Sequence, residues 1–321
     1  MKIEKIVGSG ALNIDYFYEV EDLGLIRGFT KGLTPGGEVW GTKREFETLR
    51  EKLEILGRLL AVCGGGSAAN TIYALKLWGF DTGFIGIVGD DEEGERVCAE
   101  LEGCDLSRVL RTGSTACTLI LLDHHRDRAI FVAPHTQEET LASWSCSTQK
   151  TEWLHLSSLV SHGGFLFHLR LTKAHWGPRS IDPGEIYASR GFQALKPLLQ
   201  GNKVLFMTLQ ELRRLDVSAE ELILQNNYLA LKKGAEGAEI HAPQGKVSIP
   251  AVSSPLLVDN TGAGDVFDAG FLAGLSLGLS YALSGRLAVR LAALSLRDYG
   301  RKGFPTKEEF WSLVESIRSE T

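Results

Sequence analysis

Short apolar segments that alternate with longer amphipathic ones are the feature that most constrains the fold of this chain. The apolar segments are bounded by glycine, aspartate or proline: KIVGSGALNI, FIGIVGD, WLHLSSLV, RSIDPG, KVLFMT and YLALKKG. Between most of them lie stretches with helical spacing, such as AANTIYALKLWG and EIYASRGFQALKPLLQ. Strand–helix–strand units of this kind build a mainly parallel sheet that helices cover on both faces. We therefore predict an open α/β fold with three layers.

Two regions do not follow the alternation. TACTLILLDHHRDRAIFVAP is typical of an antiparallel hairpin with a polar turn, DHHRDR, and the earlier run YFYEVEDL is suited to pair with it. Together they predict a small second sheet from about residues 16–40 and 112–133, within a single domain of residues 1–321. The other region, EVWGTKREFETLREKLEILGRLLAV, predicts an amphipathic helix packed on a sheet. Its apolar residues at three- and four-residue steps are Phe46, Leu49, Leu53, Leu56 and Leu60.

Composition and charge narrow the class of partner. The 321 residues, 44% of them hydrophobic, are enough for one large core. A formal net charge of -6, with lysine and arginine scattered along the chain, favours a small-molecule substrate over nucleic acid or a membrane. The most apolar segment, AGFLAGLSLGLSYALSG, is broken by serines and predicts a buried helix rather than a membrane span.

Cysteine and histidine usage favours neither disulfides nor a histidine metal site. The five cysteines are scattered and never spaced CxxC, which indicates reduced thiols and a cytoplasmic protein. The N-terminal MKIEKIVGSGALNID does not have the pattern of a signal peptide. None of the eight histidines has the helical spacing of a zinc site, and we interpret them as loop or surface residues. Near the end, PTKEEFWSLVESIRS predicts a helix capped by Thr306, with Glu309 three residues later.

The segment DNTGAGDVFDAG, residues 259–270, carries the clearest chemistry. Gly262 and Gly264 allow a sharp turn and a close approach of a ligand to the backbone N–H groups. The helical spacing that follows puts this turn at a helix N-terminus, whose field attracts anions and favours the ionised form of Asp265. A carboxylate there is suited to remove a proton from a hydroxyl while the turn holds a phosphoryl group. The alternative is that Asp265 only caps the helix.

A second glycine cluster, CGGGSAANTIYALKLWG, covers residues 63–79. Its glycines lead into a helix and allow a ligand close to the backbone, while Asn70 offers a donor and an acceptor to a polyhydroxylated molecule. The segment is not the dinucleotide pattern GxGxxG in its usual context, and the phosphate-binding pattern GxxxxGK followed by serine or threonine is also missing. Taken alone, such a turn is equally typical of tight packing.

GGGSAANTIYALKLWG and DNTGAGDVFDAGF together resemble the two signature segments of the PfkB family of carbohydrate kinases, within the ribokinase-like superfamily. Their order and separation are similar to the family pattern, and the similarity covers essentially the whole chain. The resemblance implies a three-layer α/β/α ribokinase-like fold with a small β-sheet lid, ATP as the donor, magnesium, and Asp265 as the catalytic base. It also implies that the backbone of Gly262, Ala263 and Gly264 stabilises the transferring phosphoryl group.

The same resemblance supplies further site residues. Family positions that bind the acceptor match Asn13 and Asp15 of ALNID, Gly65, Gly66 and Asn70. Positions that bind the nucleotide match Thr208, Lys233, Gly234 and Gly237. Glu211 of TLQE matches a glutamate associated with magnesium, through water, although Thr208 replaces the asparagine usual before it. Asp259 and Thr261 match positions that bind a monovalent cation such as potassium in some members.

Features that separate the subfamilies conflict. The long interval between Asp15 and Gly65, and the run SAANT, are similar to adenosine kinases, whereas the Asn-x-Asp of ALNID is similar to ribokinases. The leading prediction is a kinase that phosphorylates a sugar or a sugar-containing metabolite. The alternatives are a nucleoside kinase of adenosine-kinase type and a non-catalytic sugar- or nucleotide-sensing protein. Because many relatives dimerise through their lid sheets, we also expect a homodimer through the exposed hairpin edge.

Overall fold

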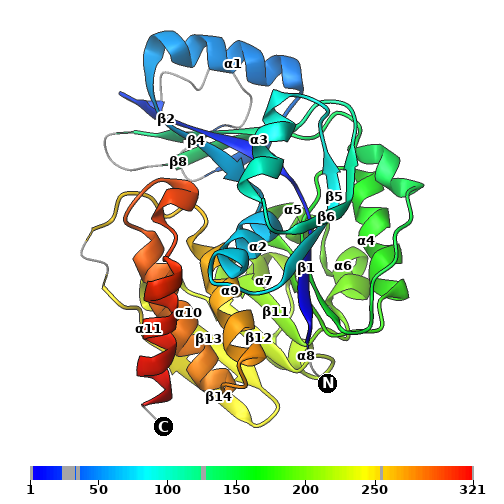
Figure 1. Cartoon of the computed structure of the whole chain (residues 1–321), viewed down its shortest axis with the longest axis vertical. Helices are drawn as coiled ribbons and strands as arrows, with labels where there is room; N and C mark the ends of the chain where they lie inside the picture. Colours follow the sequence, from blue (N-terminus) through cyan, green and yellow to red (C-terminus); the bar gives the residue numbers. More distant parts are fainter. Residues whose placement is uncertain (1–2, 24–32, 34–36, 124–127, 254–255, 320–321) are drawn as a thin grey trace.

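The computed structural model describes residues 3–23, 33, 37–123, 128–253 and 256–319. The middle of the predicted DHHRDR turn and much of the predicted 16–40 segment lie outside these residues. Within them, no helix combines the length and the apolarity that crossing a bilayer requires. Two sheets and the helices that cover them make up the structure (Figure 1).

In the described chain the main sheet has nine strands, in the order β14-β13-β12-β11-β10-β9-β1-β5-β6. The strands are β1 (Lys5–Ser9), β5 (Thr82–Val88), β6 (Asp105–Arg111), β9 (Glu152–Ser157), β10 (Arg179–Asp182), β11 (Val204–Thr208), β12 (Tyr228–Lys232), β13 (Ala238–Ala242) and β14 (Gly245–Ile249). Neighbours from β6 to β12 run parallel, and β13 and β14 continue the sheet antiparallel. Parallel strands bury both faces, which explains their nearly continuous apolar sequences.

Helices pack on both faces of the main sheet, as the alternation predicted (Figure 1). One face carries α2 (Ser67–Leu77), α3 (Glu92–Glu100), α9 (Ala263–Ser276), α10 (Tyr281–Ser295) and α11 (Lys307–Arg318). The other carries α4 (His162–Ala174), α5 (Gly184–Ala188), α6 (Phe192–Leu199), α7 (Leu209–Leu215) and α8 (Ala219–Ile223). Adjacent strand residues enter different cores: Ile6 packs in the first and Val7 in the second. The predicted three-layer α/β fold is therefore confirmed.

A smaller sheet lies beyond one end of the main sheet, with its described strands in the order β3-β8-β7-β2-β4 (Figure 1). Its strands are β2 (Asn13–Val20), β3 (Glu38–Trp40), β4 (Gly57–Gly65), β7 (Ala116–Leu122) and β8 (Arg128–Ala133). As predicted, β7 and β8 form an antiparallel hairpin and β2 pairs with it, running parallel to β7. Helix α1 (Lys43–Leu56) covers the outer face through Phe46, Leu49 and Leu53. On the inner face, Phe17 contacts Tyr299 of the main body.

Several predicted elements differ in extent. Helix α1 ends at Leu56, and Leu60 lies in strand β4. Because β4 pairs with β2 along its length, ladder hydrogen bonds override the helical spacing of the leucines. The apolar segment predicted as one buried helix forms α9 and α10, since Gly278, with φ +79°, breaks it. The apolar run KIVGSGALNI divides between β1 and the start of β2, so the Asn-x-Asp of residues 13–15 begins β2. The capping box of the last helix, by contrast, is confirmed.

The histidines are a further correction, because most of them are buried. The buried ones are His135, His155, His168, His175 and His241. His168 lies between Ser9 and Tyr187, whose hydroxyl oxygens are 3.0 and 2.9 Å from its ring nitrogens. Burial lowers the pKa of His168 to about 3, so the ring packs as a neutral polar group. Among the residues with described positions, no three potential metal-ligating side chains form a group that could hold an ion.

Candidate active site

Helix α9 begins at the edge of the sheet where the parallel strands end, and its first turn forms the centre of the candidate site. Gly262 caps this helix with φ +79°, a conformation that glycine adopts without strain. Asp265 stands in the first turn and is only 9% exposed. The backbone N–H groups of Gly262, Ala263 and Gly264 form the predicted anion cradle. Of these, Ala263 already donates its N–H to the carbonyl oxygen of Asn260, at 3.3 Å. The cradle therefore lies at a helix N-terminus, where anions bind favourably.

The predicted acceptor residues converge where β2 begins. The Nδ2 atom of Asn13 is 2.5 Å from Oδ1 of Asp15 and 2.9 Å from Oγ1 of Thr118 on the neighbouring strand. A Cβ atom on Gly65 would lie 2.2 Å from Oδ2 of Asp15. Gly66 has φ +95°, and a Cβ atom there would lie 2.1 Å from a carbonyl oxygen of the β1–β2 connection. Glycine at position 65 thus allows β4 to approach the acid, and glycine at position 66 allows the turn into α2.

Asn70, in the first turn of α2, joins the two halves of the site. Its Nδ2 atom donates to Oδ2 of Asp265 at 2.9 Å, and its Oδ1 atom accepts from Nε of Arg301 at 3.0 Å. The hydroxyl of Thr71 donates to the main-chain oxygen of Asp265 at 3.2 Å. The N-cap of α9 is Gly262, which has no side-chain cap. The Asp265 carboxylate thus faces α2 instead of capping its own helix.

Burial controls the charge state of both acids. It raises the pKa of Asp265 to about 7, against the hydrogen bond from Asn70 and the charge of Lys232. Burial also raises the pKa of Asp15 to about 7, against the charge of Arg301. The prediction that the helix field favours ionised Asp265 is therefore outweighed, because loss of solvation is the larger effect. A carboxyl group that titrates near neutral pH is suited to act as a general base.

A second charged cluster surrounds Lys232, at the end of β12. Its Nζ atom is 2.5 Å from Oδ2 of Asp182, at the end of β10, and 3.2 Å from Oδ1 of Asp268 on α9. It is also 3.4 Å from where a Cβ atom on Gly264 would stand, so the ammonium lies beside the cradle. Although burial opposes the charge, Asp182 and Asp268 raise the pKa of Lys232. A permanent positive charge therefore stands next to the first turn of α9.

The predicted nucleotide residues lie at the ends of β11 and β12. Thr208 and Glu211 form the capping box of α7: the N–H of Thr208 donates to Oε2 of Glu211 at 2.8 Å. Burial, followed by the charge of Asp182, raises the pKa of Glu211 to about 7. The turn after β12 contains the predicted residues Lys233, Gly234 and Gly237, and includes the short helix η3 (Gly234–Glu236). Both of its glycines have positive φ, which is what allows this tight turn.

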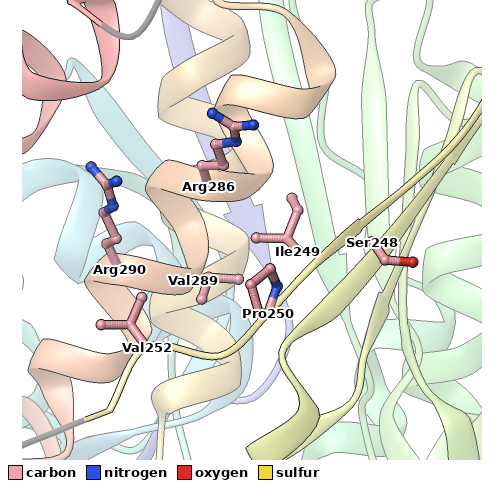
Figure 2. Close-up of a pocket in the computed structure, with 7 residues that line it drawn as sticks. All are labelled: Ser248, Ile249, Pro250, Val252, Arg286, Val289 and Arg290. Atoms are coloured by element: carbon pink, nitrogen blue, oxygen red, sulfur yellow. The ribbon is translucent and has the colours of Figure 1, made fainter.

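A cavity of about 260 Å³ opens near this turn (Figure 2). It lies between strand β14 with the segment after it and helix α10, and is lined by Ser248, Ile249, Pro250, Val252, Arg286, Val289 and Arg290. A Cβ atom on Gly237 would lie 2.1 Å from the carbonyl oxygen of Ile249, so the turn packs on the lining strand. Largely apolar walls with a few polar groups are typical of small-molecule sites.

The predicted cation residues fasten the loop before α9. Oδ1 of Asp259 accepts from the N–H and the hydroxyl of Thr261, at 3.0 and 2.8 Å, and Oδ2 accepts from the N–H of Gly300 at 3.1 Å. From the smaller sheet, Arg128 donates to Oδ1 of Asn260 at 3.0 Å and to the Thr261 hydroxyl at 3.3 Å. The carboxylate of Asp259 is therefore engaged by donors of the chain itself.

Sequence reasoning missed four charged residues of the site. Two of them had a local signal: Asp182 ends a parallel strand, and Asp268 lies one helical turn after Asp265. For the third, the family resemblance indicated the neighbouring Lys233 instead of Lys232. The Nζ atom of Lys233 lies 3.8 Å from a carboxylate oxygen of Glu236. The fourth, Arg301, had no local signal, because its partners Glu100 and Asn70 are 201 and 231 residues away along the chain.

The family model of pfkB carbohydrate kinases matches residues 60–307, well over half of the chain. The chain belongs to the pfkB family of carbohydrate kinases. As a member, it is a phosphotransferase with an alcohol group as acceptor. The predicted family, fold and class of reaction are thereby confirmed.

Relatives of this carbohydrate kinase agree with the assignment. An uncharacterized sugar kinase of Archaeoglobus fulgidus is 34% identical over 246 residues, which cover 72% of this chain and 98% of that protein. The ATP-dependent ribose-1-phosphate kinase of Halopiger xanaduensis is 32% identical over 260 residues, which cover 76% and 84%. The solved nucleoside kinase of Methanocaldococcus jannaschii, a ribokinase-family member, covers 98% of this chain and 99% of its own, with a TM-score of 0.77 at 21% identity.

Proposed function

We propose that this kinase transfers the γ-phosphoryl group of ATP to a hydroxyl of a sugar or a sugar-containing metabolite, with Asp265 as the base. One observation carries the proposal: Asp265 is buried in the first turn of α9 and hydrogen-bonded by Asn70, and the helix of Asn70 begins just after Gly65, which packs on Asp15. Asp265 stands beside the anion cradle, and Asp15 stands among polar groups that can hydrogen-bond the hydroxyls of an acceptor. That division of roles is what phosphorylation of a polyol requires.

In the proposed reaction Asp265 takes the proton of the acceptor hydroxyl. The hydroxyl oxygen bonds to the γ-phosphorus while the bond from that phosphorus to the β,γ-bridging oxygen breaks, and ADP leaves. The N–H groups of Gly262 and Gly264, that of Ala263 once it leaves Asn260, and the ammonium of Lys232 stabilise charge on the transferring group. Because the pKa of Asp265 is about 7, the base is substantially ionised at neutral pH.

The proposed acceptor contacts are Asn13, Asp15, Gly65, Gly66 and Asn70. A carboxylate such as that of Asp15 accepts hydrogen bonds from two neighbouring hydroxyls, which suits a furanose. Asp15 and Asp265 are 6% and 9% exposed, so an acceptor reaches them only when the structure opens. We therefore propose that the smaller sheet with α1 is the lid of a single kinase domain, and that its closure excludes water.

We assign the nucleotide to the turn of Lys233, Gly234 and Gly237, with its base in the cavity of Figure 2. The turn packs against strand β14, so phosphates near α9 and a base in the cavity are compatible with one extended ligand. Thr208 is paired with Lys232 at the end of β12. We therefore assign Thr208 to the phosphates of the nucleotide and not to its base.

Magnesium fits the acids at this edge of the sheet. Glu211 and Asp182 offer the hard oxygen ligands that magnesium prefers, and a nearby cation would offset the burial and the Asp182 charge that raise the pKa of Glu211. They would hold the ion through water, together with nucleotide phosphates, and the bound ion would neutralise phosphate charge. Asp259 and Thr261 would bind the potassium ion. Comparing the activity in KCl with that in NaCl tests whether the kinase requires it.

A coupled assay tests the proposed reaction. The acceptors are pentoses, hexoses, sugar phosphates including ribose 1-phosphate, and nucleosides, each with ATP and with ADP as donor. We expect turnover of at least one sugar or sugar phosphate with ATP. Ligand-dependent melting without any phosphorylated product would instead indicate a sensing protein and contradict the proposal.

A nucleoside acceptor is the second candidate, because the inner face of the smaller sheet changes from polar to apolar. Asp15 and Thr118 are followed on the same face by Phe17 and Ile120, which pack together with Leu122. A nucleoside has the same order, with ribose hydroxyls at one end and a flat apolar base at the other. Phe17→Ala should then impair nucleoside turnover more than sugar turnover, and a panel without nucleoside turnover removes this candidate.

The predicted hairpin edge is not exposed, because β7 pairs with β2 and β8 pairs with β3 in the described sheet. We propose instead a homodimer through another edge of the smaller sheet. Strand β4 is an edge strand of the described sheet, and Leu59 on it is 50% exposed. Ile55 and Leu56, at the end of α1, add exposed apolar surface beside it. Exposed edges of this kind are prone to pair with a second chain. Light scattering of the wild type and of Leu59→Lys tests the pairing.

We also propose a cytoplasmic location, which the five free cysteines support. Cell fractionation tests it.

A further inference from the structure

Arg301 lies beneath the acceptor half of the site, in the short helix η4 (Gly300–Gly303), and is only 5% exposed. Its Nη1 atom is 2.9 Å from Oε2 of Glu100, at the end of α3. Its guanidinium carbon lies 4.8 Å from the ring centre of Tyr73. An ion pair on one side and an aromatic ring on the other hold the guanidinium in one orientation.

The Nε atom of Arg301 determines which way the Asn70 amide faces. It donates to Oδ1 of Asn70 at 3.0 Å, which leaves Nδ2 to donate to Asp265 at 2.9 Å. The reversed amide would place its NH2 group against a guanidinium donor and its oxygen against a carboxylate. Both contacts would be repulsive, since neither pairs a donor with an acceptor.

Glu100 connects this arrangement to the smaller sheet. Its Oε2 atom also accepts the N–H of Gly64, in strand β4, at 2.8 Å. A Cβ atom on Gly64 would lie 2.3 Å from Nη1 of Arg301, so the strand packs directly on the guanidinium. The orientation of the Asn70 amide therefore depends on β4 being in place.

We propose that Arg301, held by Glu100, is a positioning residue that turns the donor group of Asn70 toward Asp265 and links this orientation to strand β4. The inference rests on the proposed function, in which Asp265 is the base. A hydrogen bond from Asn70 favours the ionised carboxylate, so its loss raises the pKa of Asp265 and leaves less of the base ionised at neutral pH.

The other charged groups that face Asp265 are Lys232 on β12, Asp182 on β10, Asp268 on α9 and Asp15 on β2. Arg301 also lowers the pKa of Asp15 through its charge. A test must therefore separate the route through Asn70 from a direct effect of the arginine charge on Asp15.

Arg301→Met and Glu100→Gln test the inference in the full chain, with ATP and the compound of the acceptor panel that the wild type turns over fastest. For Arg301→Met we expect kcat to fall about 100-fold. We also expect the acid limb of the profile of kcat/KM against pH to move up by about one pH unit. Glu100→Gln should move the limb in the same direction by less. The matched control is Arg297→Met, which breaks the paired contacts of Arg297 with Glu309 outside the site. It should lower the Tm without moving the limb.

Asn70→Leu separates the two routes. If Arg301 acts through Asn70, the single variants shift the limb equally and the double variant shifts it no further. Additive shifts, or an active Arg301→Met with the wild-type limb, would overturn the inference. If Arg301→Met does not fold, an unmoved limb in Glu100→Gln overturns it instead. A wild type that phosphorylates nothing in the panel refutes the proposed function, which is a different result from an unmoved limb in an active variant.

Discussion

Replacing Asp265 by asparagine should stabilise the ligand-free protein, and more so at alkaline than at acidic pH. Burial raises the pKa of this carboxyl from 3.8 to about 7. A group whose pKa is raised on folding contributes its full stability below the unfolded pKa and loses it as the pH rises through the folded pKa. The wild type therefore becomes less stable across the interval between these two values, and asparagine does not titrate there.

The size of the effect follows from the shift. Between about pH 5.5 and about pH 8, folded Asp265 must release a proton that the unfolded chain has already lost. The free energy of unfolding of the wild type should fall by about 2 kcal/mol relative to Asp265→Asn over this interval. For a domain of this length that difference corresponds to about 3 °C in Tm.

Thermal unfolding of both proteins at the two pH values measures the effect. The control is Asp105→Asn, because hydrogen bonds from Ser107 lower the pKa of Asp105 to about 2. The Asp105 carboxylate is therefore ionised over this pH interval in both the folded and the unfolded protein. Its Tm difference from the wild type should not change with pH. An Asp265→Asn advantage that is absent, or equal at both pH values, would refute the reasoning that burial controls this carboxyl.

Four further predictions concern the rest of the site. Gly66→Ala should destabilise the protein by about 3 kcal/mol or more, because φ is +95° and the new Cβ atom would strike a carbonyl oxygen; the Tm measures this. Lys232→Met should lower kcat by about 100-fold in steady-state kinetics, since it removes the charge beside the cradle. Val289→Trp should fill the cavity of Figure 2 and raise the KM for ATP about tenfold with little change in that for the acceptor. EDTA should abolish turnover, and added magnesium should restore it; activity that survives chelation would contradict the magnesium assignment.

The parts of the fold that sequence predicted are those in which local pattern and tertiary context agree. The parallel strands are short apolar runs between Gly, Asp or Pro, and the turn at Gly262 is followed at once by helical spacing. Strand β4 was missed because its leucines continue the spacing of α1, and only pairing with β2 defines it as a strand. Burial of His168 likewise depends on Ser9 and Tyr187, which are distant in sequence.

The candidate site divides in the same way. Asp265 and its glycine turn could be found from the residues themselves, whereas Asn13 and Asp15 were found through the resemblance to the family. Their contact with the glycines of β4 became visible only in the structure. Arg301 could not be found, since an arginine becomes a site residue only when folding brings Glu100 and Asn70 to it.

The most direct test of the central claim is phosphoryl transfer by Asp265→Asn, measured as phosphorylated product and ADP formed from ATP and the acceptor that the wild type uses. Asparagine keeps the shape of the side chain and cannot accept the hydroxyl proton as a carboxylate does. We predict that kcat falls by about 1,000-fold or more, while calorimetry shows that ATP and the acceptor still bind. Near-normal turnover by this variant would contradict the account of Asp265 as the base.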